Sequence, residues 1–350
     1  MNTQKEIEAE KLMDEVLADK EMRVAYFEND FEAFFQYHYG WENLTDWHRQ
    51  WLQLFETRLD LLFVTMRASR KTTMARGYAV WCIAYSKEPY IVVQSYEEKM
   101  SSAWVRSVAK MLMEPSIRED YGDLFPYNIR REDMQKASFN NFDSTTGVKI
   151  ESRSLVQNLR GANEYEIGEH SKRPTLLFLD DIDIDTSTRN VDIIDANFDK
   201  LRTETLGAMD PTRRRVIFLG NVIRNDGIAV RFEREYAANP GWKITRLFLY
   251  DGPGGTNIWP EVFTEEVVEK LKFDGTTSFN ANYLGVPMAD GVSIIKRSSI
   301  RYANEEPEGC RIVGGIDPAF SEKTGSDPMA FTITGHKGIQ KFVMASIEFT

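Results

Sequence analysis

Two short segments of the sequence combine residue types that bind phosphate and a divalent cation. An apolar run at residues 61–64 leads through a turn to Lys71 and Thr72, where a helical pattern begins, and a second apolar run ends in Asp180 and Asp181. A lysine and a hydroxyl at a helix start suit phosphate oxygens and their metal, and a carboxylate after a buried strand suits hydrated Mg²⁺. The pair therefore predicts a site in which one turn holds a triphosphate and the other holds the metal.

The first segment departs from the general phosphate-loop pattern G-x-x-x-x-G-K-[ST]. Thr65 and Arg70 stand where the two glycines belong. The helix that follows the turn is predicted to be amphipathic, with its apolar residues on one broad face. The alternative to a phosphate loop is a surface turn that opens an ordinary helix. On the nucleotide interpretation, the phosphates are cradled by the turn and first helical residues, namely Ser69, Arg70, Lys71, Thr72 and Thr73.

The second segment reads as a buried parallel strand, because such strands are continuous apolar runs and ligands gather at their carboxyl ends. Asp180 is predicted to hold Mg²⁺ through water, and Asp181 lies where many ATPases place the glutamate that polarises the attacking water. One alternative is a solvated acidic loop. Another is a calcium loop, since Asp181, Asp183 and Asp185 alternate, but the turn glycine and bidentate glutamate of such a loop are absent.

Composition is that of an ordinary globular protein, with 350 residues, 42% hydrophobic and 28% charged. No run approaches the roughly 18 apolar residues of a membrane span, and the N-terminus lacks the apolar core of a signal peptide. The two cysteines and four scattered histidines predict neither a disulfide framework nor a metal cluster.

A net charge of −11 argues against a protein that binds nucleic acid over its whole surface. Contacts with DNA would therefore need local basic patches. Candidate patches are Arg130-Arg131, Arg213-Arg214-Arg215 and Lys296-Arg297, although each is more often a solvated turn.

Apolar runs alternate with helical patterns along most of the chain, which predicts an α/β fold with a mostly parallel sheet flanked by helices. The first 40 residues are charged and amphipathic, which predicts a helical preface. Strands are predicted at residues 61–65, 90–94, 148–150, 176–179, 216–219 and 242–250, and helices at residues 97–113, 192–206 and 228–237.

Beyond a glycine-rich loop at residues 251–256, two helical patterns at 264–272 and 278–284 give way to β-rich sequence after Gly291. Three strands are predicted at residues 312–317, 329–334 and 340–347, with a turn at His336-Lys337-Gly338. An acid, Asp317, ends the first of them, and Asp327 is a weaker second. This order suits the opening of an RNase H-like fold, whose nucleases hold two divalent metals between carboxylates.

Taken in order, six segments resemble the large terminase subunit of tailed bacteriophages, the motor that packages DNA into procapsids. The resemblance extends over nearly the whole chain and implies a RecA-like P-loop ATPase followed by an RNase H-like nuclease. The segments are Leu44–Trp51, Met66–Thr72, Gln157–Gly161 with Arg173–Asp181, Phe218–Asn221, Ile258–Pro260 with Tyr283–Pro287, and Gly315–Ala319.

The resemblance also implies roles for individual residues. Trp47 and Gln50 match the aromatic and glutamine positions near the adenine, and Lys71 with Thr72 matches the phosphate and Mg²⁺ ligands. Three further polar residues would act on the γ-phosphate: Arg67 from the phosphate loop, Arg160 as a finger toward a neighbouring subunit, and Asn221 as a sensor that couples hydrolysis to DNA movement.

For the second domain, the resemblance makes Asp317 a ligand for Mg²⁺ or Mn²⁺ in DNA cleavage. Two departures concern the first domain: Arg70 places a bulky cation at a glycine position, and Asp181 is shorter than the usual glutamate. The implied organisation is a helical segment at 1–40, the ATPase with its linker helices at 41–290, and the start of a nuclease at 291–350. The sequence ends before the nuclease's further acids, so endonuclease activity is expected only of a full-length protein.

The implied cofactors are ATP and Mg²⁺, and the implied partners are double-stranded DNA, a portal protein and a small terminase subunit, with no membrane. The motor would act as a ring on the portal in the host cell cytoplasm, with a monomer possible in isolation. Two alternatives remain: a helicase-type P-loop ATPase, which single-stranded nucleic acid would stimulate, and a scaffold that has lost nucleotide binding.

Overall fold

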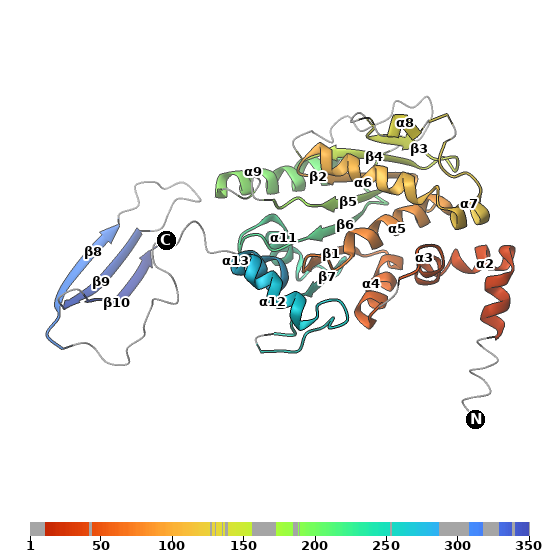
Figure 1. Ribbon diagram of the computed structural model, residues 1–350. Helices are drawn as coiled ribbons and strands as arrows, with labels where there is room; N and C mark the ends of the chain where they lie inside the picture. Colours follow the sequence, from red (N-terminus) through yellow and green to blue (C-terminus); the bar gives the residue numbers. More distant parts are fainter. Residues whose placement is uncertain are drawn as a thin grey trace. The chain divides into compact units, whose positions relative to one another are not determined.

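The computed structural model describes residues 11–41, 44–126, 128–129, 131–134, 136, 139–155, 173–184, 188, 190–252, 254–286, 308–317, 329–337 and 340–349. The chain divides into two compact units, Met1–Gly291 and Val292–Thr350, whose elements are drawn in Figure 1. Among the described residues, no helix combines the length and apolar character needed to cross a membrane.

A seven-stranded sheet forms the centre of the first unit. Its strands are β1 (Asp60–Thr65), β2 (Tyr90–Ser95), β3 (Asn141–Asp143), β4 (Lys149–Ser154), β5 (Leu176–Asp180), β6 (Arg215–Gly220) and β7 (Trp242–Leu247). Their spatial order is β3-β4-β2-β5-β6-β1-β7, and all neighbours are parallel except β3 and β4. Because β1, β5 and β6 are adjacent and parallel, their carboxyl ends meet at one edge of the sheet.

Helices pack on both faces of this sheet, and the remaining helices of the unit pack on other helices. They are α2 (Lys20–Phe27), α3 (Phe31–Tyr39), α4 (Asp46–Glu56), α5 (Lys71–Ala84), α6 (Glu98–Met111), α7 (Pro115–Tyr121), α8 (Arg131–Met134), α9 (Val191–Lys200), α10 (Leu206–Ala208), α11 (Ile228–Tyr236), α12 (Glu265–Asp274) and α13 (Thr276–Leu284), with a π-helical turn at Leu201–Thr205. Alternate side chains of β1 enter different cores. Leu61 and Phe63 pack with α3 to α7, whereas Leu62 and Val64 pack with α9 and α11.

The predicted α/β class with a mostly parallel sheet is confirmed, and most predicted strands and helices lie within two or three residues of their observed positions. One detail is wrong. The helix after the phosphate loop, α5, is buried around its circumference rather than on one face, because α3 and α6 both pack against it. Gly77 is required there, since a Cβ at this position would overlap the ring of Phe35.

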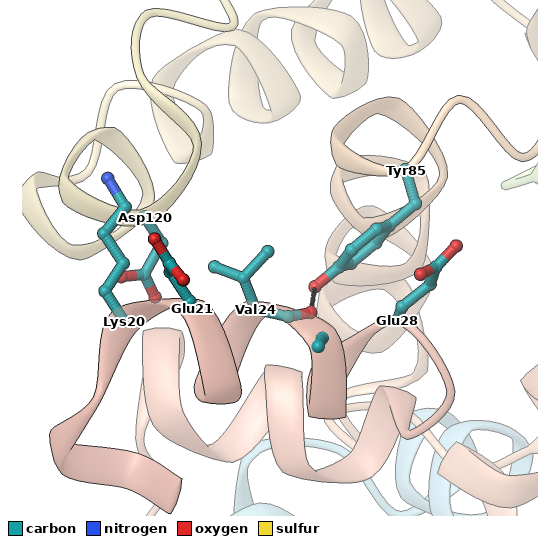
Figure 2. Close-up of a pocket in the computed structure, with 7 residues that line it drawn as sticks. Lys20, Glu21, Val24, Glu28, Tyr85 and Asp120 are labelled. Carbon is teal, nitrogen blue, oxygen red and sulfur yellow. Dashed lines mark hydrogen bonds between the residues drawn. The ribbon is translucent and has the colours of Figure 1, made fainter.

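Buried polar contacts hold the N-terminal helices against α5 and α7. Figure 2 shows Tyr85 of α5 beside α2, where its hydroxyl donates to the Val24 carbonyl at 2.7 Å and the surrounding residues line a cavity of about 400 Å³. Asp120 also lines this cavity, and both of its carboxylate oxygens accept hydrogen bonds from Arg23, at 3.0 and 2.5 Å. His38 lies 3.6 Å from the same carboxylate, with its side chain fully buried.

The second unit is a three-stranded antiparallel sheet in the order β10-β9-β8. β8 spans Arg311–Asp317, β9 spans Met329–Lys337 and β10 spans Gln340–Phe349. The three predicted strands are therefore present, but the predicted turn is wrong in part, because His336 and Lys337 still pair with β10 and belong to β9.

Acid should destabilise the first unit through His38. Burial lowers the pKa of this imidazole to about 4, against an ordinary value near 6.5 for an unfolded chain. Between these values the unfolded chain binds more protons, so stability is present at neutral pH and lost as the pH falls from about 6.5 to 4, by up to about 1.4 kcal/mol per pH unit. We expect the melting temperature of the His38→Gln variant, measured by circular dichroism, to fall less steeply across this range than that of the wild type. Parallel profiles would contradict the assignment.

Candidate nucleotide site

The turn between β1 and α5 has a backbone suited to anion binding without any glycine. φ is +62° at both Ala68 and Arg70, and negative at Ser69 between them. Alternation of this kind points successive N–H groups into one concavity, which is the geometry of backbone phosphate nests. The hydroxyls of Thr65 and Ser69 lie 3.1 Å apart across the turn and are both buried, so they close it from within.

Arg70 occupies the left-handed region at the N-cap of α5, the position at which the general pattern has glycine. Its guanidinium carbon lies 4.8 Å from the ring centre of Trp41 and 5.2 Å from that of Trp259. The cation therefore stacks on an aromatic platform, and cation–π contact of this kind offsets part of the cost of the backbone conformation. The neighbouring His48 is kept neutral, because burial and then the charge of Arg70 lower its pKa to about 3.

Lys71 and Thr72 are the first residues of α5. Their side chains contact residues at the ends of β6, the neighbour of β1, and of β5, the next strand in the sheet. The Lys71 ammonium donates to the Asn221 side-chain oxygen at 2.7 Å, directly after β6. The Thr72 hydroxyl donates to an Asp180 oxygen at 3.3 Å, at the end of β5. Residues more than 100 positions apart in sequence are thus brought together as the spacing predicts, at the carboxyl edge of the sheet.

The electrostatics of these contacts are those of charges removed from water. Burial lowers the pKa of Lys71, opposed by the nearby carboxylates of Asp180 and Asp181. Burial and then the charge of Asp181 raise the pKa of Asp180 to about 7, opposed by Lys71 and Arg76. The carboxylates therefore favour the charged form of Lys71, and Lys71 in turn favours the ionised form of Asp180.

Two charged residues, one within the site and one beside it, were not assigned a nucleotide role from the sequence. Arg76 lies one helical turn after Thr72 on α5, and its charge favours the ionised form of Asp180. The sequence did contain a signal for Arg76, since residues four apart on a helix, such as Thr72 and Arg76, lie on the same face. Asp183 is the other, and it contacts the backbone of α11 rather than a metal.

The remaining predicted nucleotide residues lie around this centre in different settings. Trp47 stacks on His48 with ring centres 3.4 Å apart and meets Trp259 edge-on. Gln50 is exposed on α4 and lines a groove of about 570 Å³ between α4 and β7. Thr73 lies in the first turn of α5, and its N–H donates to the Arg70 carbonyl at 3.0 Å.

Three predicted catalytic or metal residues have distinct outcomes. Arg67 is exposed in the phosphate loop, where its N–H donates to the Asn282 carbonyl at 2.8 Å and its charge contributes to the lowered pKa of Lys71. Arg160 lies outside the described residues. Asp317 ends β8 and is exposed, and the described residues contain no cluster of three or more metal-binding side chains.

The basic patch predicted at residues 213–215 is wrong in one member. Arg213 and Arg214 are exposed, but Arg215 is 2% exposed and donates to the Phe55 carbonyl at 2.8 Å and to the Tyr78 hydroxyl. It therefore anchors α4 and α5 to β6 and is unavailable to a polyanion. Arg130 and Lys296-Arg297 lie outside the described residues, as does Asp327.

Replacing Arg70 should reveal the backbone strain at the start of α5. Arg70→Gly and Arg70→Ala both remove the stacked cation, but only glycine adopts positive φ without cost, so we expect the glycine variant to be the more stable by about 1 kcal/mol. Chemical denaturation measures this difference. As a matched control, the same pair at Arg49, exposed within α4, should favour alanine, as helix interiors do. An alanine preference at both positions would contradict the strain.

Comparison with known proteins gives likenesses of fold. No protein-family model and no curated protein matches the sequence. Among solved structures, the large terminase of the thermophilic bacteriophage D6E, determined with ADP, is similar at 10% identity and a TM-score of 0.43, over 83% of this chain and 63% of that protein. The ATPase domain of the Thermus phage P74-26 large terminase matches at 11% and 0.42, over 73% of this chain and 98% of that domain. A Phi-28 gp11 DNA packaging motor matches at 13% and 0.36, over 75% and 74%. The chain spans under two thirds of the length of the D6E protein.

Proposed function

We propose that this chain is a Mg²⁺-dependent ATPase that drives DNA packaging in the manner of a large terminase. The single observation that carries the ATPase proposal is the contact at 3.3 Å between the Thr72 hydroxyl and the Asp180 carboxylate. A hydroxyl after the phosphate-loop lysine and an acid at the end of a nearby strand are the two protein oxygens that hold Mg²⁺ in P-loop enzymes. They meet here although 108 residues separate them in sequence.

The oxygen atoms present suit Mg²⁺ better than most other metals. One buried carboxylate and one hydroxyl supply hard ligands, and the described part of the chain contains no cluster of three or more acids, histidines and cysteines. Mg²⁺ typically uses one or two protein ligands and takes the rest from water and substrate phosphates. When bound, the ion would neutralise charge on the phosphates and orient them.

The side chains of the site then have distinct tasks. Lys71 and the loop N–H groups bind phosphate oxygens, and the buried position of Lys71 excludes water from that contact. Asp181 follows Asp180 and accepts a proton from, or orients, the attacking water. Asn221 accepts a hydrogen bond from Lys71 at 2.7 Å, so a phosphate that draws Lys71 away also releases Asn221. That exchange is a means of sensing the γ-phosphate.

The motor function rests on the order of the sequence motifs and is a further step. Double-stranded DNA would be gripped through its phosphate backbone, with Arg67 and Arg160 serving ATP hydrolysis within a ring on the portal protein. A small terminase subunit would present the DNA, and the β8–β10 sheet with Asp317 would begin an RNase H-like nuclease. These activities would be exerted in the host cell cytoplasm.

Turnover of ATP tests the site directly. We expect Lys71→Ala and Asp180→Asn each to lower Mg²⁺-dependent phosphate release at least about 100-fold, because each removes a charge that acts on the transferring phosphoryl group. The matched controls are Lys243→Ala and Asp251→Asn, exposed residues of the same types, which should retain wild-type rates. Equal rates in all four variants would refute this site.

Nucleic acid separates the motor from its alternatives. Linear double-stranded DNA is expected to raise the wild-type rate more than single-stranded DNA of equal nucleotide content. A preference for single strands would indicate a helicase-type ATPase instead. Well-folded protein that neither binds nor hydrolyses ATP would indicate a scaffold.

A further inference from the structure

Asp183, three residues beyond Asp180, is a buried acid that the nucleotide site does not itself use. Its two carboxylate oxygens accept hydrogen bonds from the backbone N–H groups of Ile228 and Ala229, at 2.9 and 2.8 Å. Asp183 is 5% exposed. The side chain therefore caps the N-terminus of α11 from a different loop.

The capping contact joins the two loops that carry the site. One loop leaves β5 with Asp180 and Asp181 and continues to Asp183, and the other leaves β6 with Asn221 and ends at α11. A second bond joins the same two loops, since the Arg224 guanidinium donates to the Thr188 carbonyl at 2.7 Å. The acids at the end of β5 and the amide at the end of β6 are thus connected by side chains as well as by the sheet.

The fit around Asp183 is close. A Cβ on Gly227 would lie 3.2 Å from the Asp183 Oδ2 atom, tighter than ordinary van der Waals contact, so the backbone approaches the carboxylate where a side chain would obstruct it. Burial raises the pKa of Asp183 to about 6, opposed by the two N–H donors. At pH 7 and above the group is an anion at a helix N-terminus, where the dipole and two charge-assisted hydrogen bonds favour it.

We propose that Asp183 is a positioning residue that latches the Asn221 loop to the Asp180–Asp181 loop and so sets Asn221 against Lys71. The proposal rests on the proposed ATPase function for its effect on rate, but the latch itself is a property of the two loops. Asp183 acts through Asn221 and Lys71 and touches no substrate. Loss of the latch leaves the phosphate loop intact and frees Asn221 from its setting.

Steady-state kinetics of Asp183→Asn distinguish positioning from simple stabilisation. Asparagine keeps the shape but turns a donor toward one of the two N–H groups, so we expect kcat to fall about 10- to 100-fold, as misplacement of an active group by about 1 Å does, while KM for ATP changes less than about threefold. The matched control is Asp30→Asn, another helix N-cap, which accepts from the Ala33 N–H at 2.8 Å on α3. Wild-type kcat in Asp183→Asn would overturn the proposal.

A milder variant covers the case in which Asp183→Asn does not fold. Gly227→Ala keeps the charge and crowds the carboxylate, and φ at Gly227 is −58°, so alanine meets no backbone penalty there. We expect an intermediate loss in kcat with KM again little changed. An unaltered kcat in this variant, with Asp183→Asn unfolded, would also count against the latch.

A thermal double-mutant cycle tests the latch without any turnover. Melting temperatures of Asp183→Asn, Asn221→Ala and the double variant should be non-additive, with the double variant shifted less than the two single shifts together, because loss of the latch already weakens the Asn221–Lys71 contact that Asn221→Ala removes. Additive shifts would overturn the latch whatever the activity. If the shifts are non-additive but the wild-type protein hydrolyses no ATP, the latch is upheld and the proposed function is rejected.

Discussion

The site depends on the burial of one cation, Lys71, among groups that compensate its charge. A lysine removed from water is costly unless opposite charge or a good acceptor lies close. Here Asn221 accepts from the ammonium at 2.7 Å, and the two aspartates after β5 favour its charged form. Since these partners follow different strands, the cation is stable only if β1, β5 and β6 lie adjacent and parallel. The fold and the site therefore constrain each other.

The phosphate loop has a left-handed backbone conformation at positions that are not glycine. Ala68 and Arg70 take the left-handed conformation that glycine adopts freely, at a cost of about 1–2 kcal/mol each. Asp181 has φ of +50°, so strained residues lie in both turns of the site. Strain of this kind persists only where surrounding contacts over-determine it. For Arg70, those contacts are the rings of Trp41 and Trp259, which also direct the guanidinium onto an aromatic platform.

Sequence reasoning recovered what depends on local pattern and missed what depends on tertiary packing. The apolar runs at β1, β5 and β6 and the polar residues at their ends were readable, because buried parallel strands are continuous and their carboxyl ends converge. The burial of α5 on all sides was not, since its pattern cannot reveal that α3 covers the face left by α6. The strand β3 was not predicted, because its three residues are too few to show a pattern. The left-handed conformation of Arg70 was not predicted either, because residues other than glycine give no sign of a positive φ in the sequence. Asp183 looked like one of three alternating acids, and only the position of α11 distinguishes it.

The contrast between α5 and the loops that face it bears on how such a site could move. α5 is packed on every side, with Gly77 admitting the Phe35 ring, so Lys71 and Thr72 start from a rigid element. The groups opposite them lie on loops held by a few hydrogen bonds, among them those of Asp183. Packed cores respond to force in discrete steps, whereas loop contacts can be exchanged. A change that a ligand causes at Lys71 therefore passes into the Asn221 loop and the start of α11, and from there through the Ile228 and Ala229 N–H groups to Asp183 and the loop after β5.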